Sequence, residues 1–229
     1  MLTIAVLYPE LLGTYGDGGN GLVLAERARR RGLEVSLELV SMRDELPAAD
    51  IYLLGGGEDG PQRLASDLLA KNGFVERVSD GSYVVAVCAG LQILGRSFCV
   101  EGNDEYRGLG LVDVVTRRGA VRSVGELCVR VGEQLLVGFE NHGGRTSLGE
   151  GVAPLGRVLK GRANDGEVDG YRTDHIWASY AHGPVLAMNP WFADEILATV
   201  LERELTPLET AADLLYARRR QILTADSAG

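Results

Sequence analysis

A cysteine marks the junction between a predicted strand and a predicted helix. Val84 to Val87 is an apolar run of buried-strand length, and the residues from Leu91 onward have a helical pattern, so the chain must turn at Cys88. A side chain on such a turn points into the mouth of a sheet, and the small residues Ala89 and Gly90 allow the tight bend. The free N–H groups of the new helix would favour a thiolate. We therefore interpret Cys88 as a candidate nucleophile, with a buried core cysteine as the alternative.

Three histidines are available as the general base that a cysteine nucleophile needs. His182 follows an apolar run, Ile176 to Ala181, and precedes Gly183, which places it at the end of a predicted strand. His142 lies in a polar turn better suited to shaping a pocket, and His175 lies in a stretch typical of an exposed loop. Placement therefore favours His182 as the base, with His142 as the alternative.

Acyl transfer also needs donors aimed at a developing oxyanion. Gly55, Gly56 and Gly57 directly follow the predicted strand Ile51 to Leu54, and their N–H groups can approach a ligand closely because no side chain intervenes. The N–H of Ala89 is a further candidate donor. A tight strand-to-helix turn alone would explain one or two of these glycines.

The elements that must position these residues alternate between strand and helix in the first half of the chain. The predicted strands are 2–7, 33–40, 51–54 and 84–87, and the predicted helices are 20–31 and 61–79. This alternation predicts an α/β fold of the flavodoxin-like kind, with a mostly parallel central sheet and helices on both faces. Ligands of such sheets bind outside the carboxyl ends of the strands.

The second half of the chain has a different pattern. Residues 111–115, 126–131, 135–139, 168–171 and 176–181 alternate as strands, which we expect to be antiparallel and to extend or flank the main sheet. Two helices are expected to close the chain, the second starting at the capping signal Thr206-Pro207-Leu208-Glu209. We expect one domain over residues 1–229.

Composition narrows the function. The 229 residues are 45% hydrophobic and carry a net charge of −9, which favours a globular protein and argues against a nucleic-acid or anionic-membrane partner. Cys88, Cys99 and Cys128 have no metal-binding or disulfide spacing, so no metal is expected. With no leader and no apolar run of membrane length, the chain is expected in the cytoplasm.

A glycine-rich run resembles a dinucleotide fingerprint. Residues 16–21 match G-x-G-x-x-G before a predicted helix, and Glu38 lies near the end of the second predicted strand. Residues 9–15 separate this run from the first strand, however, whereas the fingerprint requires the turn to follow at once. The sequence also has no G-x-x-x-x-G-K-[ST] loop. We therefore expect no nucleotide site and no cofactor in this chain.

Five stretches in order carry a resemblance to a known family. They are Leu7 to Asn20, Leu54 to Asp59, Val87 to Gly95, Gly138 to Thr146 and Tyr180 to Leu186. With them, the sequence resembles the class I glutamine amidotransferases of the cobyric acid synthase-like group. Within this group it is similar to the GatD glutaminase subunits of lipid II isoglutaminyl synthase, which work with the Mur-ligase-like MurT. The resemblance covers nearly the whole chain.

The resemblance implies roles for the residues that match. Cys88 attacks the side-chain amide of glutamine, His182 protonates the departing ammonia, and a glutamyl thioester is then hydrolysed. Gly56, Gly57 and Ala89 would form the oxyanion hole.

Four further residues match the substrate pocket. Gln92 corresponds to a family glutamine near the nucleophile. Arg122 falls about where an arginine of the GatD group binds the substrate carboxylate, which suits its planar fork. Asn141 and His142 would complete the pocket.

One departure from the family pattern concerns the histidine. Class I enzymes carry a glutamate two residues after it, and here that position is Pro184. The resemblance implies that a carboxylate from the synthetase subunit orients His182 instead, and that this chain alone is a weak glutaminase. The acceptor implied is the D-glutamate of lipid II, which becomes D-isoglutamine. The alternatives are a subunit serving a cobyrinate-type synthetase, a DJ-1-like or peptidase-like cysteine hydrolase, and a non-catalytic binding subunit.

Overall fold

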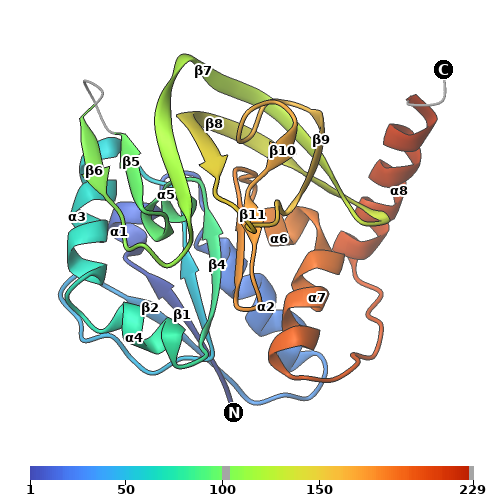
Figure 1. The fold of residues 1–229 in the computed structure, drawn as a ribbon. Coiled ribbons are helices and arrows are strands. Elements are labelled where there is room, and N and C mark those ends of the chain that lie inside the picture. Colours follow the sequence, from blue (N-terminus) through green and yellow to red (C-terminus); the bar gives the residue numbers. More distant parts are fainter. Residues whose placement is uncertain (100–103, 227–229) are drawn as a thin grey trace.

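The computed structural model describes residues 1–99 and 104–226, and its main sheet has six strands in the order β11-β12-β4-β3-β1-β2 (Figure 1). The strands are β1 (Leu2–Leu7), β2 (Val35–Val40), β3 (Ile51–Leu54), β4 (Tyr83–Val87), β11 (Tyr171–Arg172) and β12 (Ile176–Ser179). Only β11 runs antiparallel to its neighbour. The central strands β3 and β12 are buried along their whole length, as parallel strands covered on both faces must be.

The prediction for Ile176 to Ala181 was right about the strand and wrong about its direction. β12 pairs in parallel with β4, with Ser179 opposite Val87. Its carboxyl end therefore lies at the same edge of the sheet as the carboxyl end of β4. Cys88 and the residues after Ser179 are brought to one edge by this pairing.

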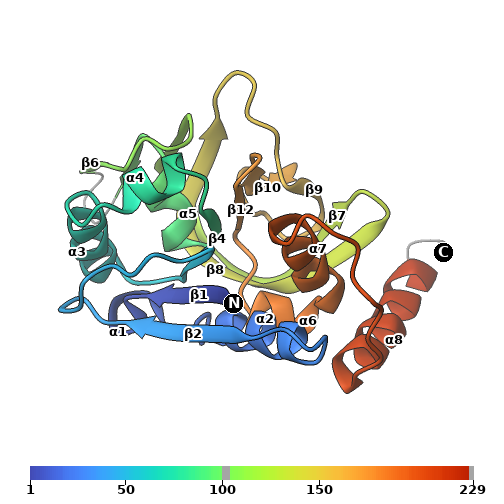
Figure 2. The ribbon, with the colours of Figure 1, turned by 90° about the horizontal axis from the view of Figure 1, so that it is seen from below.

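Helices cover both faces of the main sheet. They are α1 (Pro9–Leu12), α2 (Gly19–Arg29), α3 (Asp59–Leu69), α4 (Phe74–Ser79), α5 (Ala89–Leu94), α6 (Val185–Met188), α7 (Pro190–Val200) and α8 (Ala211–Asp226). Figure 2 shows α3, α4 and α5 on one side of β1, with α2, α6 and α7 on the other. The predicted helix 61–79 is two helices, because Gly73 adopts a left-handed conformation with φ 86° between them. The α/β fold with a mostly parallel sheet is confirmed.

A second sheet of six strands flanks the carboxyl edge of the first. It contains β5 (Ser97–Cys99), β6 (Glu105–Arg107), β7 (Val114–Val131), β8 (Gln134–Leu148), β9 (Gly156–Lys160) and β10 (Val168–Asp169). The strands predicted between residues 111 and 139 are largely one long antiparallel hairpin, β7–β8, whose register shifts between Arg118 and Ser123. In Figure 1 this hairpin arches over the main sheet. It carries side chains to the same edge from above.

The C-terminal helix is tied to the body by ion pairs and a tyrosine. The guanidinium of Arg27 in α2 donates to the carboxylates of Asp194 in α7 and Asp213 in α8, and its side chain is 5% exposed. The hydroxyl of Tyr216 donates to the carbonyl of Leu135. The predicted cap at Thr206 is wrong by one turn: α8 begins at Ala211, where the Thr210 hydroxyl and the Asp213 carboxylate bond to each other.

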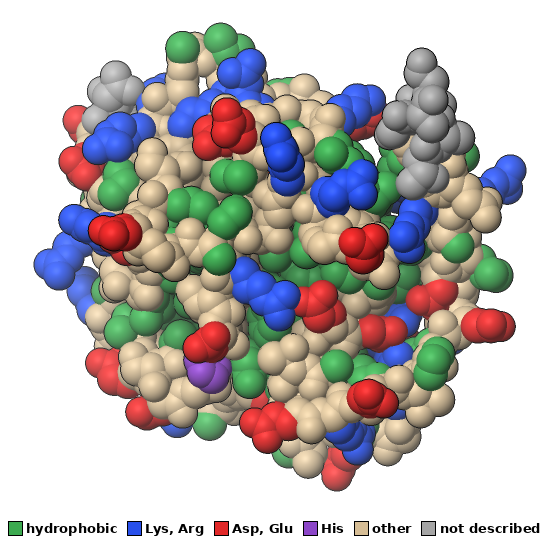
Figure 3. All heavy atoms as spheres, turned by 45° about the vertical axis from the view of Figure 1, so that its right-hand side comes forward, with side chains coloured by type: hydrophobic (Ala, Val, Ile, Leu, Met, Phe, Trp, Pro, Cys, Tyr) green, Lys and Arg blue, Asp and Glu red, His purple; other side chains and the backbone are tan. Residues whose placement is uncertain are grey.

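The surface mixes side-chain types. Figure 3 shows basic, acidic and apolar side chains interspersed on the face that includes α8. Leu214, Leu215 and Ile222 of α8 are exposed. Among residues 1–99 and 104–226, no helix combines the length and apolar character needed to span a bilayer.

Candidate active site

Cys88 occupies a strained turn between β4 and α5. Its backbone has φ 52° and ψ −103°, a conformation that non-glycine residues avoid and that persists only where the surrounding structure enforces it. Its N–H donates to the carbonyl of Ser179 at 2.9 Å, and the N–H of Gly90 donates to the carbonyl of Gly55 at 3.1 Å. The turn is therefore held from both neighbouring strands. This is the strand-to-helix elbow that the sequence predicted.

The Cys88 thiol is neutral in the resting structure. Burial raises its pKa to about 12, and the negative charge of Asp17 adds to the rise. The N–H of Ala89 and the charge of Arg122 act in the opposite direction but do not compensate. The expectation of a thiolate stabilised by the helix is thus wrong, and α5 is only 6 residues long. Cys88 needs a base that removes its proton as it attacks.

His182 lies at the same edge of the main sheet as this turn, between the two sheets. It follows β12, and its backbone exchanges hydrogen bonds of 2.8 and 3.2 Å with Phe139 of β8. Its ring is fully buried, stacks on the ring of Phe139 and meets the edge of Tyr15 at a centroid distance of 4.5 Å. Its Nε2 has no partner among the described residues and can accept a proton.

A carboxylate of this chain holds the other nitrogen of His182. The Oδ2 of Asp17 lies 2.9 Å from Nδ1, and both side chains are 0% exposed. The sequence showed no carboxylate two residues after His182, but the structure places one from this chain against its ring. Asp17 belongs to the glycine-rich run that was considered for a nucleotide. No local pattern indicated this contact, because the two residues lie 165 positions apart.

The other histidines are excluded as the base by their surroundings. His142 has both ring nitrogens engaged, Nε2 with the Glu140 carboxylate at 2.9 Å and Nδ1 with the Gly144 carbonyl at 3.1 Å. His175 precedes the amino end of β12, and its carbonyl accepts from the N–H of Val84 at the start of β4. It thus lies at the opposite edge of the sheet from Cys88.

The two candidate glycine donors of the oxyanion hole differ. The N–H of Gly56 donates to Asp17 Oδ2 at 2.9 Å, so it is not free for an oxyanion, contrary to the expectation. The N–H of Gly57 has no acceptor among the described residues, and that of Ala89 faces the Cys88 thiol. These two N–H groups are available to a tetrahedral intermediate at Cys88.

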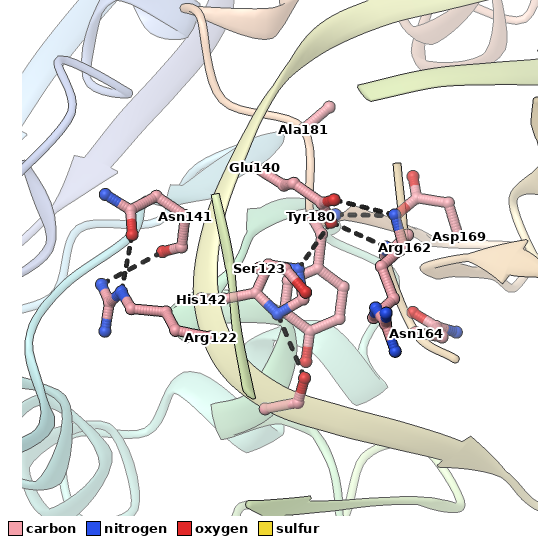
Figure 4. Close-up of polar contacts among 12 residues, drawn as sticks. Arg122, Ser123, Glu140, Asn141, His142, Arg162, Asn164, Asp169, Tyr180 and Ala181 are labelled. Carbon is pink, nitrogen blue, oxygen red and sulfur yellow. Dashed lines mark hydrogen bonds and ion pairs between the residues drawn. The ribbon is translucent and has the colours of Figure 1, made fainter. Parts of the chain in front are cut away.

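One cavity brings most of the predicted residues together. Its lining includes Gly57, Cys88, Ala89, Gln92, Arg122, Asn141 and His142. Arg122, in the irregular part of β7, donates from Nε to the Oδ1 of Asn141 at 2.7 Å (Figure 4). One of its terminal nitrogens donates to the Tyr15 hydroxyl at 3.4 Å. Its guanidinium is exposed and makes no ion pair with a described carboxylate, so it can receive an anionic group. His182 does not line this cavity.

A buried amide forms the back of the cavity. Gln92 accepts from the Nε2 of Gln62 at 3.0 Å and donates to the Tyr180 hydroxyl at 3.1 Å. That hydroxyl also shares a hydrogen bond of 2.7 Å with Thr146. Gln62 and Tyr180 were not predicted as site residues, because nothing local in the sequence links them to Gln92.

A second histidine–carboxylate pair supports this wall. The ring of His142 stacks on that of Tyr180 (Figure 4), and the ring centroids are 3.9 Å apart. Burial would raise the pKa of the Glu140 carboxyl, but hydrogen bonds from His142 and from the N–H groups of Ala163 and Arg162 hold it below its ordinary value. Burial lowers the pKa of the His142 imidazole. The pair is thus a buried structural support rather than a proton donor to substrate.

No group of three His, Cys, Asp or Glu side chains suited to a metal ion occurs among residues 1–99 and 104–226. The described residues supply parts that acyl transfer needs: a thiol on an elbow, a histidine whose Nδ1 contacts a carboxylate, and the N–H groups of Gly57 and Ala89.

Comparison with known proteins gives consistent results. Two GatD subunits of lipid II isoglutaminyl synthase (glutamine-hydrolyzing) are similar to this chain. The one from Streptococcus pneumoniae is 34% identical over 212 residues, covering 89% of this chain and 82% of the relative. The one from Staphylococcus aureus is 33% identical over 215 residues, covering 91% and 88%. The solved structure of PurLQS from Thermotoga maritima has a similar fold, with a TM-score of 0.60 at 16% identity, covering 88% of this chain and 98% of that chain.

The family profile of the CobB/CobQ-like glutamine amidotransferase domain matches residues 3–190, which include Asp17, Cys88 and His182. On this match, and on the identity to relatives over most of its length, the chain belongs to the CobB/CobQ-like glutamine amidotransferase family.

Proposed function

We propose that this chain is the glutaminase subunit of an ATP-dependent amide ligase, and that it supplies ammonia for converting the D-glutamate of lipid II to D-isoglutamine. The glutaminase activity is supported by one observation: the strained Cys88 elbow and His182, whose Nε2 is unpartnered among the described residues, stand at the same edge of the main sheet. The choice of acceptor is supported by the similarity to GatD subunits over about nine tenths of the chain.

Attack begins from the neutral thiol. As Sγ of Cys88 adds to the side-chain amide carbon of glutamine, Nε2 of His182 takes the thiol proton. The negative charge that forms on the amide oxygen is stabilised by the N–H groups of Gly57 and Ala89. No hydrogen bond joins Cys88 to His182 among the described residues, and such contacts often tighten only when substrate is bound.

Collapse of the intermediate releases ammonia. His182 returns the proton to the departing nitrogen, the C–N bond breaks, and a γ-glutamyl thioester remains on Cys88. A water molecule then attacks the thioester while His182 again acts as base, and glutamate leaves as the thiol is restored. The N–H groups of Gly57 and Ala89 serve both steps.

The amino-acid end of the substrate lies toward β7 and β8. Arg122 binds the α-carboxylate through its planar fork, with Asn141 fixing its Nε. Gln92 has one amide hydrogen and one oxygen lone pair beyond those used by Tyr180 and Gln62, and it can bind polar atoms of the substrate. His142 shapes this wall without taking part in proton transfer.

The amide-forming step belongs to a second protein. The sequence has no phosphate-binding G-x-x-x-x-G-K-[ST] loop, so ATP is expected on a Mur-ligase-like synthetase that receives the ammonia. The similar GatD proteins are themselves named as subunits. The proposal places the reaction in the cytoplasm, where ATP is available.

The experiment measures glutamate release from glutamine by the wild-type chain and by Cys88→Ala, each with and without the co-purified synthetase. The wild type should release glutamate and Cys88→Ala should not. Cys128→Ala, which removes another buried free thiol, should match the wild type. A glutamine-derived diazo-ketone should label Cys88, which a hydrolase of another class would leave unlabelled. Glutamate release that survives in Cys88→Ala would exclude the proposed nucleophile.

The complex of this chain with the co-purified synthetase is also used to identify the acceptor of the ammonia. A partner with a Mur-ligase core, and amidated lipid II as product, are the expected results. If the partner instead has a phosphate-binding loop and amidates a cobyrinate, the proposed acceptor is wrong and the proposed glutaminase activity stands.

A further inference from the structure

The glycine-rich run 16–21 follows α1 and enters α2 at Gly19, and the reaction steps above use none of its residues. Its pattern is that of a dinucleotide-binding turn, yet the structure leaves little space there. A Cβ on Gly19 would lie 2.5 Å from the ring of Pro184, the residue that replaces the family's usual orienting glutamate. The run is packed against the residues that follow His182, and Asp17 is the buried charge within it.

We propose that Asp17 is the positioning carboxylate of the active site, and that it fixes the tautomer of His182 and the shape of the Gly55–Gly57 turn at the same time. The inference rests on the proposed glutaminase function. It assigns to a residue of this chain the task that the family resemblance implied for the synthetase.

The contact with Asp17 determines which ring nitrogen of His182 carries the proton. An ionised carboxylate only accepts hydrogen bonds, so the contact of 2.9 Å with Asp17 Oδ2 requires the proton on Nδ1 of His182. The unprotonated nitrogen is then Nε2, which is the one without a partner. Only this tautomer can take the proton of Cys88. When His182 becomes charged during attack, the same carboxylate stabilises the imidazolium.

Asp17 also holds the turn that follows β3. The oxygen that holds His182 also accepts the N–H of Gly56 at 2.9 Å. A Cβ on Gly56 would lie 2.6 Å from Cε1 of His182, so the ring packs directly on this backbone. One carboxylate oxygen thus locks the base and the turn that carries the free N–H of Gly57. Removal of this oxygen should disturb both.

Asp17 is in turn held in place by contacts of the segment around it. Its carbonyl accepts the N–H of Asn20 at 3.0 Å, and the side chain of Asn20 accepts the N–H of Leu186 at 2.9 Å. The ring of Tyr15 covers His182 on the same side. The segment from Tyr15 to Asn20 is therefore fixed to both ends of the stretch that contains the histidine.

This arrangement has a consequence for the partner. Nδ1 of His182 already has a carboxylate, so a carboxylate from the synthetase is not needed to orient the ring. Any activation by the synthetase must act on another feature, such as the approach of Cys88 to Nε2 or access to the cavity.

The test combines the protonation state of His182 with kinetics. In the ¹⁵N-histidine-labelled wild-type chain, long-range ¹H–¹⁵N spectra should show His182 with the proton on Nδ1 at neutral pH. The signal is assigned by its loss in His182→Gln. In Asp17→Asn, the amide N–H can point at Nδ1 and the proton should move to Nε2. Asp17→Glu, which keeps an acceptor, should keep the proton on Nδ1.

Activity is measured on the chain and on its complex with the synthetase. Asp17→Asn should lose about 10³-fold in kcat with little change in KM, and Asp17→Glu should recover part of that loss. Asp50→Asn is the matched control, because Asp50 also accepts a backbone N–H but from Thr3, far from the site. Thermal unfolding verifies that each variant is folded.

The outcomes separate the inference from the function. A wild-type His182 with its proton on Nε2, or full activity of Asp17→Asn in the complex, would overturn the role of Asp17. If the tautomer behaves as expected but no form releases glutamate, the proposed function fails and the positioning role of Asp17 stands.

Discussion

The side-chain amide of Gln62 donates a hydrogen bond of 3.0 Å to the Oε1 of Gln92 at the back of the catalytic cavity. The Nε2 of Gln92 in turn donates to the Tyr180 hydroxyl at 3.1 Å. The Gln92 side chain is thus held in one orientation, with its remaining donor and acceptor in fixed directions. Neither neighbour needs to touch substrate to influence how substrate binds.

Replacing Gln62 should therefore weaken glutamine binding. In Gln62→Met the bulk is kept but the donor is lost, so Gln92 is free to rotate and KM should rise about 10-fold with kcat nearly unchanged. Steady-state glutaminase kinetics measure both parameters. Gln134→Met, made at a glutamine that contacts Tyr216 of α8, should leave both unchanged. A fall in kcat alone would contradict a role in substrate binding.

Arg122 should be intolerant of a change that preserves its charge. Lysine cannot reproduce the planar fork or the bond from Nε to Asn141, so Arg122→Lys should raise KM by about 10-fold or more. Arg117→Lys is the control, since Arg117 is exposed on the same strand but outside the cavity lining. Equal KM values for the two variants would remove Arg122 from the substrate site.

In the turn after β3, replacing Gly57 with alanine should destabilise the protein. A Cβ on Gly57 would lie 2.5 Å from the carbonyl oxygen of Leu11, so Gly57→Ala must displace backbone. We expect a loss of at least about 2 kcal/mol in the free energy of unfolding and loss of most glutaminase activity. Urea unfolding and glutamate release measure the two effects.

The matched control lies three residues further on. A Cβ on Gly60, in the first turn of α3, would meet nothing within 4 Å. Gly60→Ala should leave activity unchanged and should stabilise the protein by up to about 1 kcal/mol. Similar destabilisation of both variants would mean that the close approach at Gly57 is not the cause.

Asp169 should make stability depend on pH. Burial raises the pKa of its carboxyl from 3.8 to about 6, although Ser179 and the N–H of Tyr180 donate to it. Well below pH 3.8 the group is protonated in both the folded and the unfolded state. Between pH 4 and 6 the unfolded state ionises first, so the contribution to stability is lost as pH rises, by about 3 kcal/mol in total.

Asp169→Asn isolates this effect. The amide can still accept from Tyr180 and donate to the Ser179 hydroxyl, but it does not titrate. The difference in free energy of unfolding, wild type minus variant, should fall between pH 4.5 and pH 7 in urea titrations. A difference that is constant over this range would show that Asp169 ionises normally in the folded protein.

The sequence predicted those parts of the site that local patterns encode. The apolar run before Cys88 and the small residues after it describe a strand-to-helix turn within ten residues. His182 was placed correctly because it follows an apolar run that must end where it stands. Both predictions depend on neighbours in sequence, and both agree with the positions found.

The features that sequence reasoning missed depend on distant partners. The alternation of Ile176 to Ser179 identifies a strand but not its direction, which is set by where the chain re-enters the sheet. Asp17 lies in a glycine-rich run, and its pattern cannot reveal that the acceptor serves His182 rather than a nucleotide. Gly56 and Gly57 are neighbours in one run of glycines, yet of the two only Gly56 donates its N–H to a carboxylate.

The length of the hairpin β7–β8 was not predicted either. Its exposed residues, including Arg117 and Arg118, interrupt the apolar alternation, so the pattern suggested separate short strands. The helix start at Ala211 was missed for a similar reason. Thr206 presents the stronger local signal, while the actual α8 begins after Thr210, whose hydroxyl donates to the Asp213 carboxylate.

The contact between Asp17 and His182 also bears on how the protein matures. It joins residues 165 positions apart, across a sheet in which the first strand lies between β2 and β3 and the last parallel strand lies beyond β4. Contacts of such long range form late, after the intervening strands have been ordered. During synthesis Cys88 leaves the ribosome long before His182 does. The growing chain therefore carries a thiol without its base, and the capacity to hydrolyse glutamine arises only when the fold is complete.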